Sequence, residues 1–182
     1  MDFKMFSDED KLVYRSDIIE MLRESDCDFV PPLSARTSTL DSAFGTQCTE
    51  DGILSYYEAM NEQKIFGAFD GERLIAFVSF RENFVSKVIG GDTLPNIYVS
   101  TLVMRRSARG KGLTAIMYDR LFNICYPDRS VFTRTWSTNS AHTRILCRFG
   151  FSELLRIEND RGEGIDTVYY AKPAKKKDLS AL

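Results

Sequence analysis

The chain has 182 residues, 43% of them hydrophobic and 27% charged, which suffices for one domain with a hydrophobic core and not for a second one. Its 24 basic and 26 acidic side chains give a formal net charge of −2, which excludes the strongly positive field that holds nucleic acid by its phosphates. No apolar run approaches the ~20 residues that cross a bilayer, and the N-terminal residues show no secretion signal. We therefore expect a cytoplasmic protein with one domain over residues 1–173 and a basic, flexible tail over 174–182.

The cysteines and the single histidine restrict metal and redox chemistry. Cys27, Cys48, Cys125 and Cys147 are widely spaced and form no C-x-x-C pair, so we expect reduced thiols, mostly in the core. His142 is the only histidine, whereas a histidine-based metal site usually needs two or three. The sequence therefore predicts no metal site.

The first third of the chain predicts two helices joined by a long loop. Ser7 followed by three acidic residues is a helix start, because a hydroxyl caps the first turn and carboxylates suit the positive end of the helix dipole. We expect one helix from there, with Leu12, Ile19 and Leu22 on its apolar face. A loop with room for a short helix follows over residues 26–47. The second helix has its apolar positions at Ile53, Leu54, Tyr57 and Met60.

The rest of the chain alternates strands and helices. Residues 65–69 and 74–80 predict a hairpin, and residues 97–104 predict a buried central strand. The later elements are a helix over 113–124, a strand over 130–136, a helix over 139–149, and strands over 151–157 and 167–171. The apolar stripe expected on the first of these helices is Leu113, Ile116, Met117, Leu121 and Ile124. Strand–helix–strand units impose parallel pairing and hairpins impose antiparallel pairing, so the fold class is α+β, with one mixed sheet flanked by helices.

Two glycines separate the central strand from the helix after it. Gly110 and Gly112 leave backbone N–H groups unobstructed at the positive end of a helix, where phosphates bind, and Arg109 and Lys111 add positive charge. The spacing differs from a Walker A loop, and the loop comes too late in the chain for a dinucleotide-binding strand. The sequence predicts a phosphate or pyrophosphate site, with an ordinary strand-to-helix turn as the alternative.

The segment Arg109-Gly110-Lys111-Gly112-Leu113-Thr114 resembles the R/Q-x-x-G-x-G/A acetyl-CoA signature of the GNAT N-acetyltransferase superfamily. It has Thr114 where the family has Gly or Ala. A second similarity is Asn139, which opens a helix that leads to Gly150-Phe151. The resemblance extends from about Ile53 to Ala171 and implies a GNAT-like sheet whose central parallel strands, 97–104 and 130–136, splay apart.

The resemblance also implies acetyl-CoA as the co-substrate and a set of residues that bind it. The pantetheine arm would bond to the backbone of the central strand, the pyrophosphate would lie on the glycine loop, and Asn139 would face the cofactor besides capping its helix. The implied cofactor-binding residues are Leu102, Val103, Met104, Arg109, Gly110, Lys111, Gly112, Leu113, Thr114 and Asn139.

The usual acid and base of the family are missing from their positions. Leu146 stands where many members have the tyrosine that protonates the leaving thiolate, and residues 97–104 contain no glutamate that could act as a base. His142, one helical turn before Leu146, is the catalytic candidate. A packed core histidine is the alternative.

The last hairpin is the candidate acceptor site. Its turn over residues 158–166 has four carboxylates and one arginine. In the GNAT arrangement this hairpin borders the acceptor side, so Glu158, Asp160 and Glu163 would attract cationic amines. A solvated turn is the alternative.

The reaction that these features predict is direct attack of a neutral amine on the acetyl thioester, without a covalent enzyme intermediate. A lysine-like amine with a pKa of ~10.4 costs roughly 4–5 kcal/mol to deprotonate at pH 7, so a base or a water chain is needed. One alternative is a GNAT-fold protein that binds acyl-CoA without catalysis, and another is an interaction protein that uses the lysine-rich tail. The acceptor is open between small-molecule amines and peptide or protein amines, and the protein would be a monomer or homodimer.

Overall fold

The computed structural model of the protein describes residues 1–36, 38–39, 50–86 and 94–174. Contacts divide the chain into two compact units, one of Met1–Phe80 with Ser100–Leu113 and the other of Arg81–Val99 with Thr114–Leu182. Strand β4 (Asn96–Met104) contributes its C-terminal half to the first unit and its N-terminal half to the second. The strand order is β1-β2-β3-β4 in the first and β4-β5-β7-β6 in the second.

The strands of the first unit form an antiparallel ladder. β2 (Lys64–Asp70) and β3 (Arg73–Glu82) make the predicted hairpin, with Gly71 at a φ of +60° in its turn. β1 (Asp2–Met5) pairs antiparallel with β2. This edge strand was not predicted, because four residues are too few to show an alternating pattern.

The predicted first helix is two helices, α1 (Asp8–Val13) and α2 (Arg15–Ser25), so the prediction of one helix was wrong. The chain breaks at Tyr14, whose ring packs on Phe6 at 5.5 Å and on Phe69 at 5.1 Å between centroids. That contact turns α1 so that Leu12 is 74% exposed and not on the core face.

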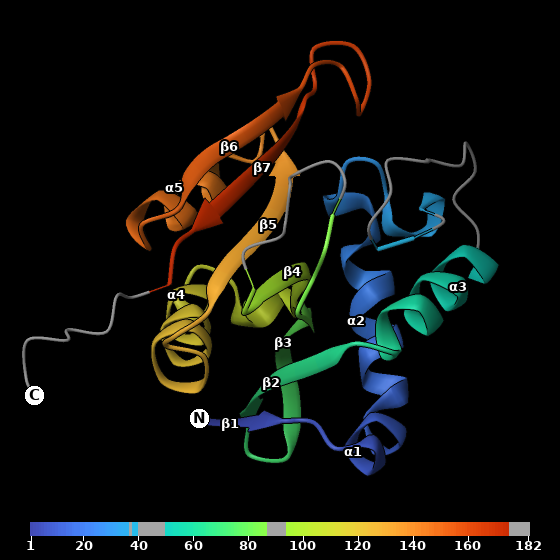
Figure 1. Ribbon diagram of the computed structural model, residues 1–182. Coiled ribbons are helices and arrows are strands. Elements are labelled where there is room, and N and C mark those ends of the chain that lie inside the picture. The colour runs from blue at the N-terminus through green and yellow to red at the C-terminus, as the bar shows by residue number, and fades with distance from the viewer. Residues whose placement is uncertain (37, 40–49, 87–93, 175–182) are drawn as a thin grey trace, which may run out of the picture. The chain divides into compact units, whose positions relative to one another are not determined.

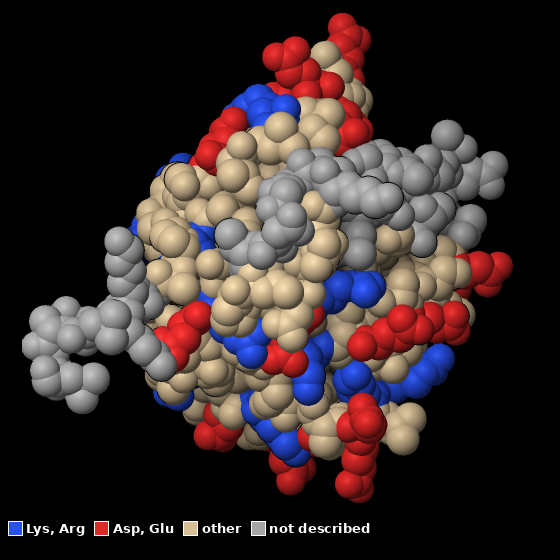
Figure 2. Space-filling model, in the orientation of Figure 1, with Lys and Arg blue, Asp and Glu red and all other residues tan. Residues whose placement is uncertain are grey.

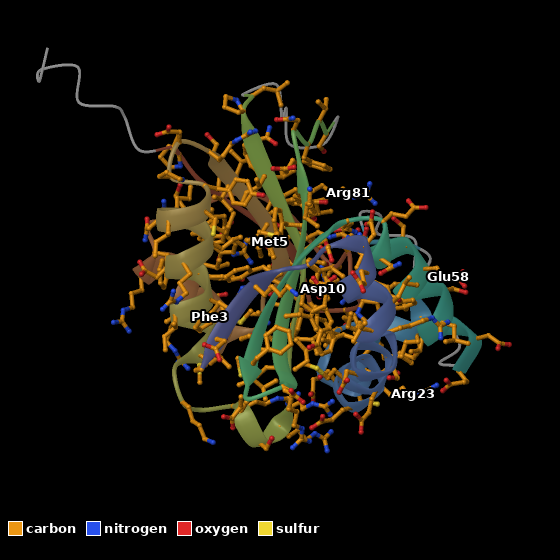
Figure 3. All side chains as sticks on the ribbon, turned by 90° about the horizontal axis from the view of Figure 1, so that it is seen from below. Phe3, Met5, Asp10, Arg23, Glu58 and Arg81 are labelled. Atoms are coloured by element: carbon orange, nitrogen blue, oxygen red, sulfur yellow. The ribbon has the colours of Figure 1, made fainter. Side chains whose placement is uncertain are left out.

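The predicted start of α1 is confirmed as a capping box. The Ser7 hydroxyl accepts from the amide of Asp10, and the Asp10 carboxylate accepts from the amide of Ser7. Lys4 Nζ of β1 donates to Asp10 Oδ1 at 2.6 Å, so the end of β1 lies beside the start of α1 (Figure 3). Chiefly because of the hydrogen bond from Lys4, the pKa of Asp10 falls to about 2.

Helices α2 and α3 (Glu50–Asn61) lie side by side in the first unit (Figure 1) and pack on its strands around one hydrophobic core. The core positions predicted on the two helices, Ile19, Leu22, Ile53, Tyr57 and Met60, are buried, and Leu54 is half-buried. The segment between the helices contains two short 3₁₀ turns, η1 (Asp26–Asp28) and η2 (Leu33–Ala35).

In the second unit β4 pairs in parallel with β5 (Ser130–Trp136), from Asn96 opposite Ser130 to Val99 opposite Thr133. β7 (Thr167–Lys172) lies antiparallel between β5 and β6 (Ser152–Ile157). The predicted combination of parallel central and antiparallel outer pairing is confirmed. The splay of β4 from β5 stays a prediction.

The helix after the glycine loop begins at the predicted residue and then changes type. α4 (Leu113–Asp119) continues into a π-helix, η4 (Arg120–Cys125). A π-helix shifts the faces of later side chains because it bonds i to i+5. The predicted stripe is therefore wrong at Ile124, which is 64% exposed. It is also wrong at Ile116, which precedes the π-helix in α4 and is 43% exposed, whereas Leu113, Met117 and Leu121 are buried. Tyr118 and Phe122 are buried in place of the two isoleucines.

The last helix, α5 (Ser140–Arg148), is one residue shorter at each end than predicted. Its residue Leu146 is fully buried. Rings of α4 and η4 pack against residues after α5, Tyr118 on Phe149 at 6.0 Å and Phe122 on Phe151 at 5.7 Å between centroids. These contacts fix α4 and α5 to each other within the second unit.

The cysteines depart from the prediction. Cys27, Cys125 and Cys147 are free, as expected, but they are exposed and not in the core. Each lies in a short helical element, η1, η4 or α5. Cys48 and Lys175–Lys177 fall outside the described residues, and the boundary at 173 stays a prediction. Within the described ranges no helix is long and apolar enough to span a membrane.

Gly52 of α3 provides a test of how closely α3 packs on η2. A Cβ at this position would lie 2.1 Å from the carbonyl oxygen of Ser34. Alanine gains about 1 kcal/mol in helix propensity. Because the Cβ would meet backbone at this distance, we expect the upper end of the about 1–3 kcal/mol that overpacking costs, and hence a loss of roughly 2 kcal/mol of unfolding free energy in Gly52→Ala. Urea denaturation measures it, with Ser55→Ala on the exposed face of the same helix as the control. A Gly52→Ala variant as stable as Ser55→Ala would contradict the close contact.

Candidate functional site

The loop between β4 and α4 has the backbone geometry that the sequence predicts. After a 3₁₀ turn, η3 (Arg106–Ala108), Gly110 and Gly112 adopt φ values of +74° and +75°. A Cβ at either glycine would meet no atom within 4 Å. Glycine is therefore needed here for its backbone conformation and not for lack of space.

The amides at the tip of this loop remain available. The amides of Ala108 and Arg109 close the 3₁₀ turn on the carbonyls of Arg105 and Arg106. Within the part of the chain that the structure describes, no backbone hydrogen bond uses the amides of residues 110–112. Such amides, next to the start of a helix, suit a ligand with several anionic oxygens.

The base of the loop is anchored by Arg105, which is 4% exposed. Its Nε donates to the carbonyl of Leu74 at 2.9 Å, and its two terminal nitrogens bond to Glu20 at 2.8 Å and Asp17 at 2.6 Å. Burial disfavours the charge, but the hydrogen bond and charge of Glu20, together with Asp17, outweigh it and raise the pKa of Arg105. Arg105 is thus a permanent cation that ties the end of β4 to β3 and α2.

The two other arginines of the loop bind the C-terminal end of α2. The amide of Arg106 donates to Glu24 Oε1 at 2.8 Å. Arg109 donates from Nε to the carbonyl of Met104 at 3.1 Å and from Nη2 to the Ser25 hydroxyl at 3.1 Å, and its Nη1 lies 2.7 Å from Asp28 Oδ2. The predicted phosphate contact Arg109 is therefore engaged by protein groups, whereas Lys111 is exposed.

The acidic partners of the loop were missed by the sequence analysis. Asp17, Glu20 and Glu24 recur at spacings of three and four residues, so they share one face of α2. That spacing was visible in the sequence. It did not show that the face would meet the glycine loop, because the two segments are about 85 residues apart.

The predicted cofactor-binding residues are distributed over both units. Leu102–Leu113 belong to the first, where Leu102 and Met104 are half-buried and Val103 faces the core at 2% exposure. Thr114 and Asn139 belong to the second, as do His142 and the acidic hairpin.

Asn139 caps α5, as predicted. Its Oδ1 accepts from the amide of His142 at 3.2 Å, and its Nδ2 donates to the Thr135 hydroxyl at 3.1 Å. The side chain thereby joins the end of β5 to the start of α5. Its contact with the cofactor stays a prediction.

His142 is hydrogen-bonded to a tyrosine that the sequence analysis did not single out. Tyr118 Oη of α4 and His142 Nε2 share a hydrogen bond of 2.8 Å, and Tyr118 is fully buried. Burial lowers the pKa of His142 to about 4 and raises that of Tyr118. At pH 7 the imidazole is neutral, which disfavours it as a proton donor to a thiolate. The catalytic assignment of His142 stays a prediction.

Arg156 pairs with one of the four carboxylates in the turn of the acidic hairpin. Asp166 pairs with Arg156 at 2.7 Å, and Asp160 accepts from the Thr167 hydroxyl at 2.5 Å. Glu158 and Glu163 are exposed, and acidic side chains gather at the tip of the β6–β7 hairpin (Figure 2). The structure therefore places the predicted acidic residues together at one turn.

The described ranges contain no group of three His, Cys, Asp or Glu side chains that could hold a metal ion.

The sequence matches the family model described as acetyltransferase (GNAT) family over residues 23–151. No curated protein sequence matches. Among solved structures, an aminoglycoside 6′-acetyltransferase type Ii aligns with a TM-score of 0.67 at 14% identity, covering 97% of this chain and 99% of its own.

Two further solved structures have the same fold. A putative acetyltransferase from Salmonella typhimurium with its cofactor acetyl-CoA aligns at a TM-score of 0.66 and 14% identity, covering 98% of this chain and 96% of its own. A ribosomal-protein-alanine N-acetyltransferase from Brucella melitensis aligns at 0.66 and 10% identity, covering 95% and 99%. At these identities the similarity shows the fold alone. It confirms the prediction of a single α+β domain with a GNAT-like fold.

The low pKa of His142 predicts a specific response to acid. Between its ordinary value of 6.5 and the folded value of about 4, the unfolded state binds a proton that the folded state does not. Stability is therefore lost as the pH falls through this window. We expect His142→Gln to lose less unfolding free energy between pH 7 and pH 5 than the wild type, measured by urea denaturation. Tyr118→Phe, which retains the imidazole, is the control. Equal losses of unfolding free energy in wild type and His142→Gln would refute the low pKa of His142.

Proposed function

Because this chain belongs to the acetyltransferase (GNAT) family, we propose that it transfers an acetyl group from acetyl-CoA to a primary amine by direct attack. The observation that supports cofactor binding best is the loop after β4. It combines two positive-φ glycines, amides without backbone partners, and Arg109 and Lys111 at their positions in the signature. These features fit the diphosphate of the cofactor.

The roles of the binding residues follow from this placement. The amides of the glycine loop would donate to the phosphate oxygens, and Arg109 and Lys111 would add charge. Backbone groups of Leu102–Met104 would bond to the pantetheine arm, and an amide beside the thioester would stabilise the developing oxyanion. Arg105 keeps the loop in place without touching the cofactor.

The proton of the amine is proposed to leave through water. The hydroxyls of the first unit's half of β4 already have partners, since Ser100 donates to Gln63 Oε1 at 2.6 Å and Thr101 shares a hydrogen bond of 2.7 Å with Tyr56. Neutral groups engaged in this way are poor bases at pH 7. The rate should then rise with pH until the amine itself is deprotonated.

A second candidate function is binding of acyl-CoA without catalysis. It is favoured by Leu146, which is buried and cannot donate a proton, and by the low pKa of His142. A thiol-release assay with acetyl-CoA and an amine library distinguishes the two candidates. Binding of CoA without release of thiol with any amine would favour the second.

We propose a cationic amine as the acceptor and the cytoplasm as the compartment. The acidic tip of the β6–β7 hairpin would attract ammonium groups. The two neighbours named for their acceptors differ, one acting on aminoglycosides and the other on a ribosomal-protein alanine, so the charge of the hairpin is the more direct guide. Three exposed free thiols suit a reducing compartment.

Cofactor binding is tested at Gly112. A glutamate there would place a side chain on a backbone with a φ of +75° and a negative charge beside the diphosphate. We expect Gly112→Glu to weaken CoA binding at least tenfold in calorimetry. Ser107→Glu, exposed in the same loop, is the control for charge alone. Unchanged affinity in Gly112→Glu would remove the glycine loop from the site.

The acceptor class is tested by neutralising Glu158 and Glu163, which are exposed. Exposed charges act weakly and are screened by salt. Glu158→Gln with Glu163→Gln should raise KM for a polycationic amine a few-fold at low ionic strength and leave KM for acetyl-CoA unchanged. Asp70→Asn with Glu72→Gln, in the β2–β3 turn, is the matched control. An unchanged KM for the amine in dilute buffer would show that the hairpin does not select the acceptor.

A further inference from the structure

The three arginines of the glycine loop are held with different strength. Arg105 is buried and has a carbonyl and two carboxylates as partners. Arg109 is different, because its side chain is 38% exposed and the side chain of its carboxylate partner, Asp28, is 41% exposed. Exposed ion pairs contribute little net stability. The Arg109–Asp28 pair is therefore the one in this loop that a soluble anion can replace.

The position of Arg109 in the sequence of the loop suits such a replacement. Arg109 directly precedes Gly110, the first of the three residues whose amides have no backbone partner. A diphosphate bound there carries more charge than a carboxylate and accepts bidentate hydrogen bonds from a guanidinium. Asp28 Oδ2, 2.7 Å from Arg109 Nη1, would repel the same diphosphate.

We propose that Asp28 competes with the diphosphate of acetyl-CoA for Arg109, so that the η1 segment lowers the affinity of the cofactor site. The proposal rests on the proposed function, since it takes the glycine loop to be the diphosphate site. Asp28 acts through Arg109 and is a positioning residue.

The competition links the cofactor loop to a segment that is distant in the sequence. Asp28 ends η1, and Asp26 at its start accepts from the amide and hydroxyl of Ser34 at 2.8 Å each. Loss of the Asp28 contact would loosen residues 26–36 as the cofactor binds. By linkage, whatever tightens this segment onto Arg109 would weaken cofactor binding by the same factor.

A contrary role for Asp28 has the opposite sign. If the carboxylate held Arg109 in the orientation that the diphosphate needs, its removal would weaken binding. The affinity of a variant without the Asp28 carboxylate therefore separates the two roles: it rises if Asp28 competes and falls if Asp28 orients Arg109.

The test compares the Kd for CoA, by calorimetry, in wild type and Asp28→Asn. We expect about twofold to fivefold tighter binding in the variant, the range that an exposed pair allows. In an Arg109→Gln background the same substitution should have at most a small effect, because no guanidinium is left to compete for. Asp70→Asn, an exposed carboxylate on β2, is the control for net charge. Equal or weaker binding in Asp28→Asn would overturn the proposal.

Two further measurements separate a failure of this proposal from a failure of the proposed function. Wild type that binds neither CoA nor inorganic pyrophosphate would refute the diphosphate site, and the competition with it. Wild type that binds both, with no gain in Asp28→Asn, would refute the competition alone.

Hydrogen exchange of residues 26–36 should become faster when wild type binds CoA, and already be fast in Asp28→Asn. Slower exchange in wild type would overturn the link to η1.

Discussion

The buried guanidinium of Arg105 is the interaction on which the arrangement of the first unit depends. Arg105 directly follows β4, and its guanidinium bonds to the start of β3 and to the acidic face of α2. A buried charge left without partners is costly. Separating these elements would leave the guanidinium of Arg105 unpaired, so the ion pairs hold them together. The glycine loop starts directly after Arg105, so the contacts of Arg105 position the start of the loop.

The acidic face of α2 has a second consequence for the loop. It places carboxylates close to a site that we propose for an anionic ligand, which lowers the positive charge available there. The amides of residues 110–112 and the exposed Lys111 remain as the groups not already used by the protein. Recognition in this loop is thus expected to depend on backbone donors more than on arginine charge.

The buried polar pair of the second unit is neutral. Tyr118 and His142 satisfy each other, and burial keeps both uncharged at pH 7. Asn139 is used at both ends of its amide. These contacts join α4, α5 and β5 within the second unit, and a buried polar pair that is satisfied in this way avoids the cost of an unpaired polar group.

The sequence by itself determined the class of fold, most of the elements and the glycine loop, because these depend on local features. Two apolar runs around the Asp70-Gly71 turn predicted the hairpin of β2 and β3, and the glycines of the loop are required by their own positive φ values. The same reasoning failed where a distant contact decided the outcome. Tyr14 splits the first helix by packing on Phe69, and a π-helix moves Ile124 to the surface.

The partners of the functional side chains were decided by the tertiary structure alone. The sequence contains Arg109 and Asp28 about 80 residues apart and gives no sign that they form an ion pair, and the same holds for Tyr118 and His142. Side-chain spacing shows which residues share a face of an element. Which other element that face contacts depends on how the whole chain packs. The loop and its signature are therefore properties of the sequence, whereas the charge and proton affinity of the site are properties of the fold.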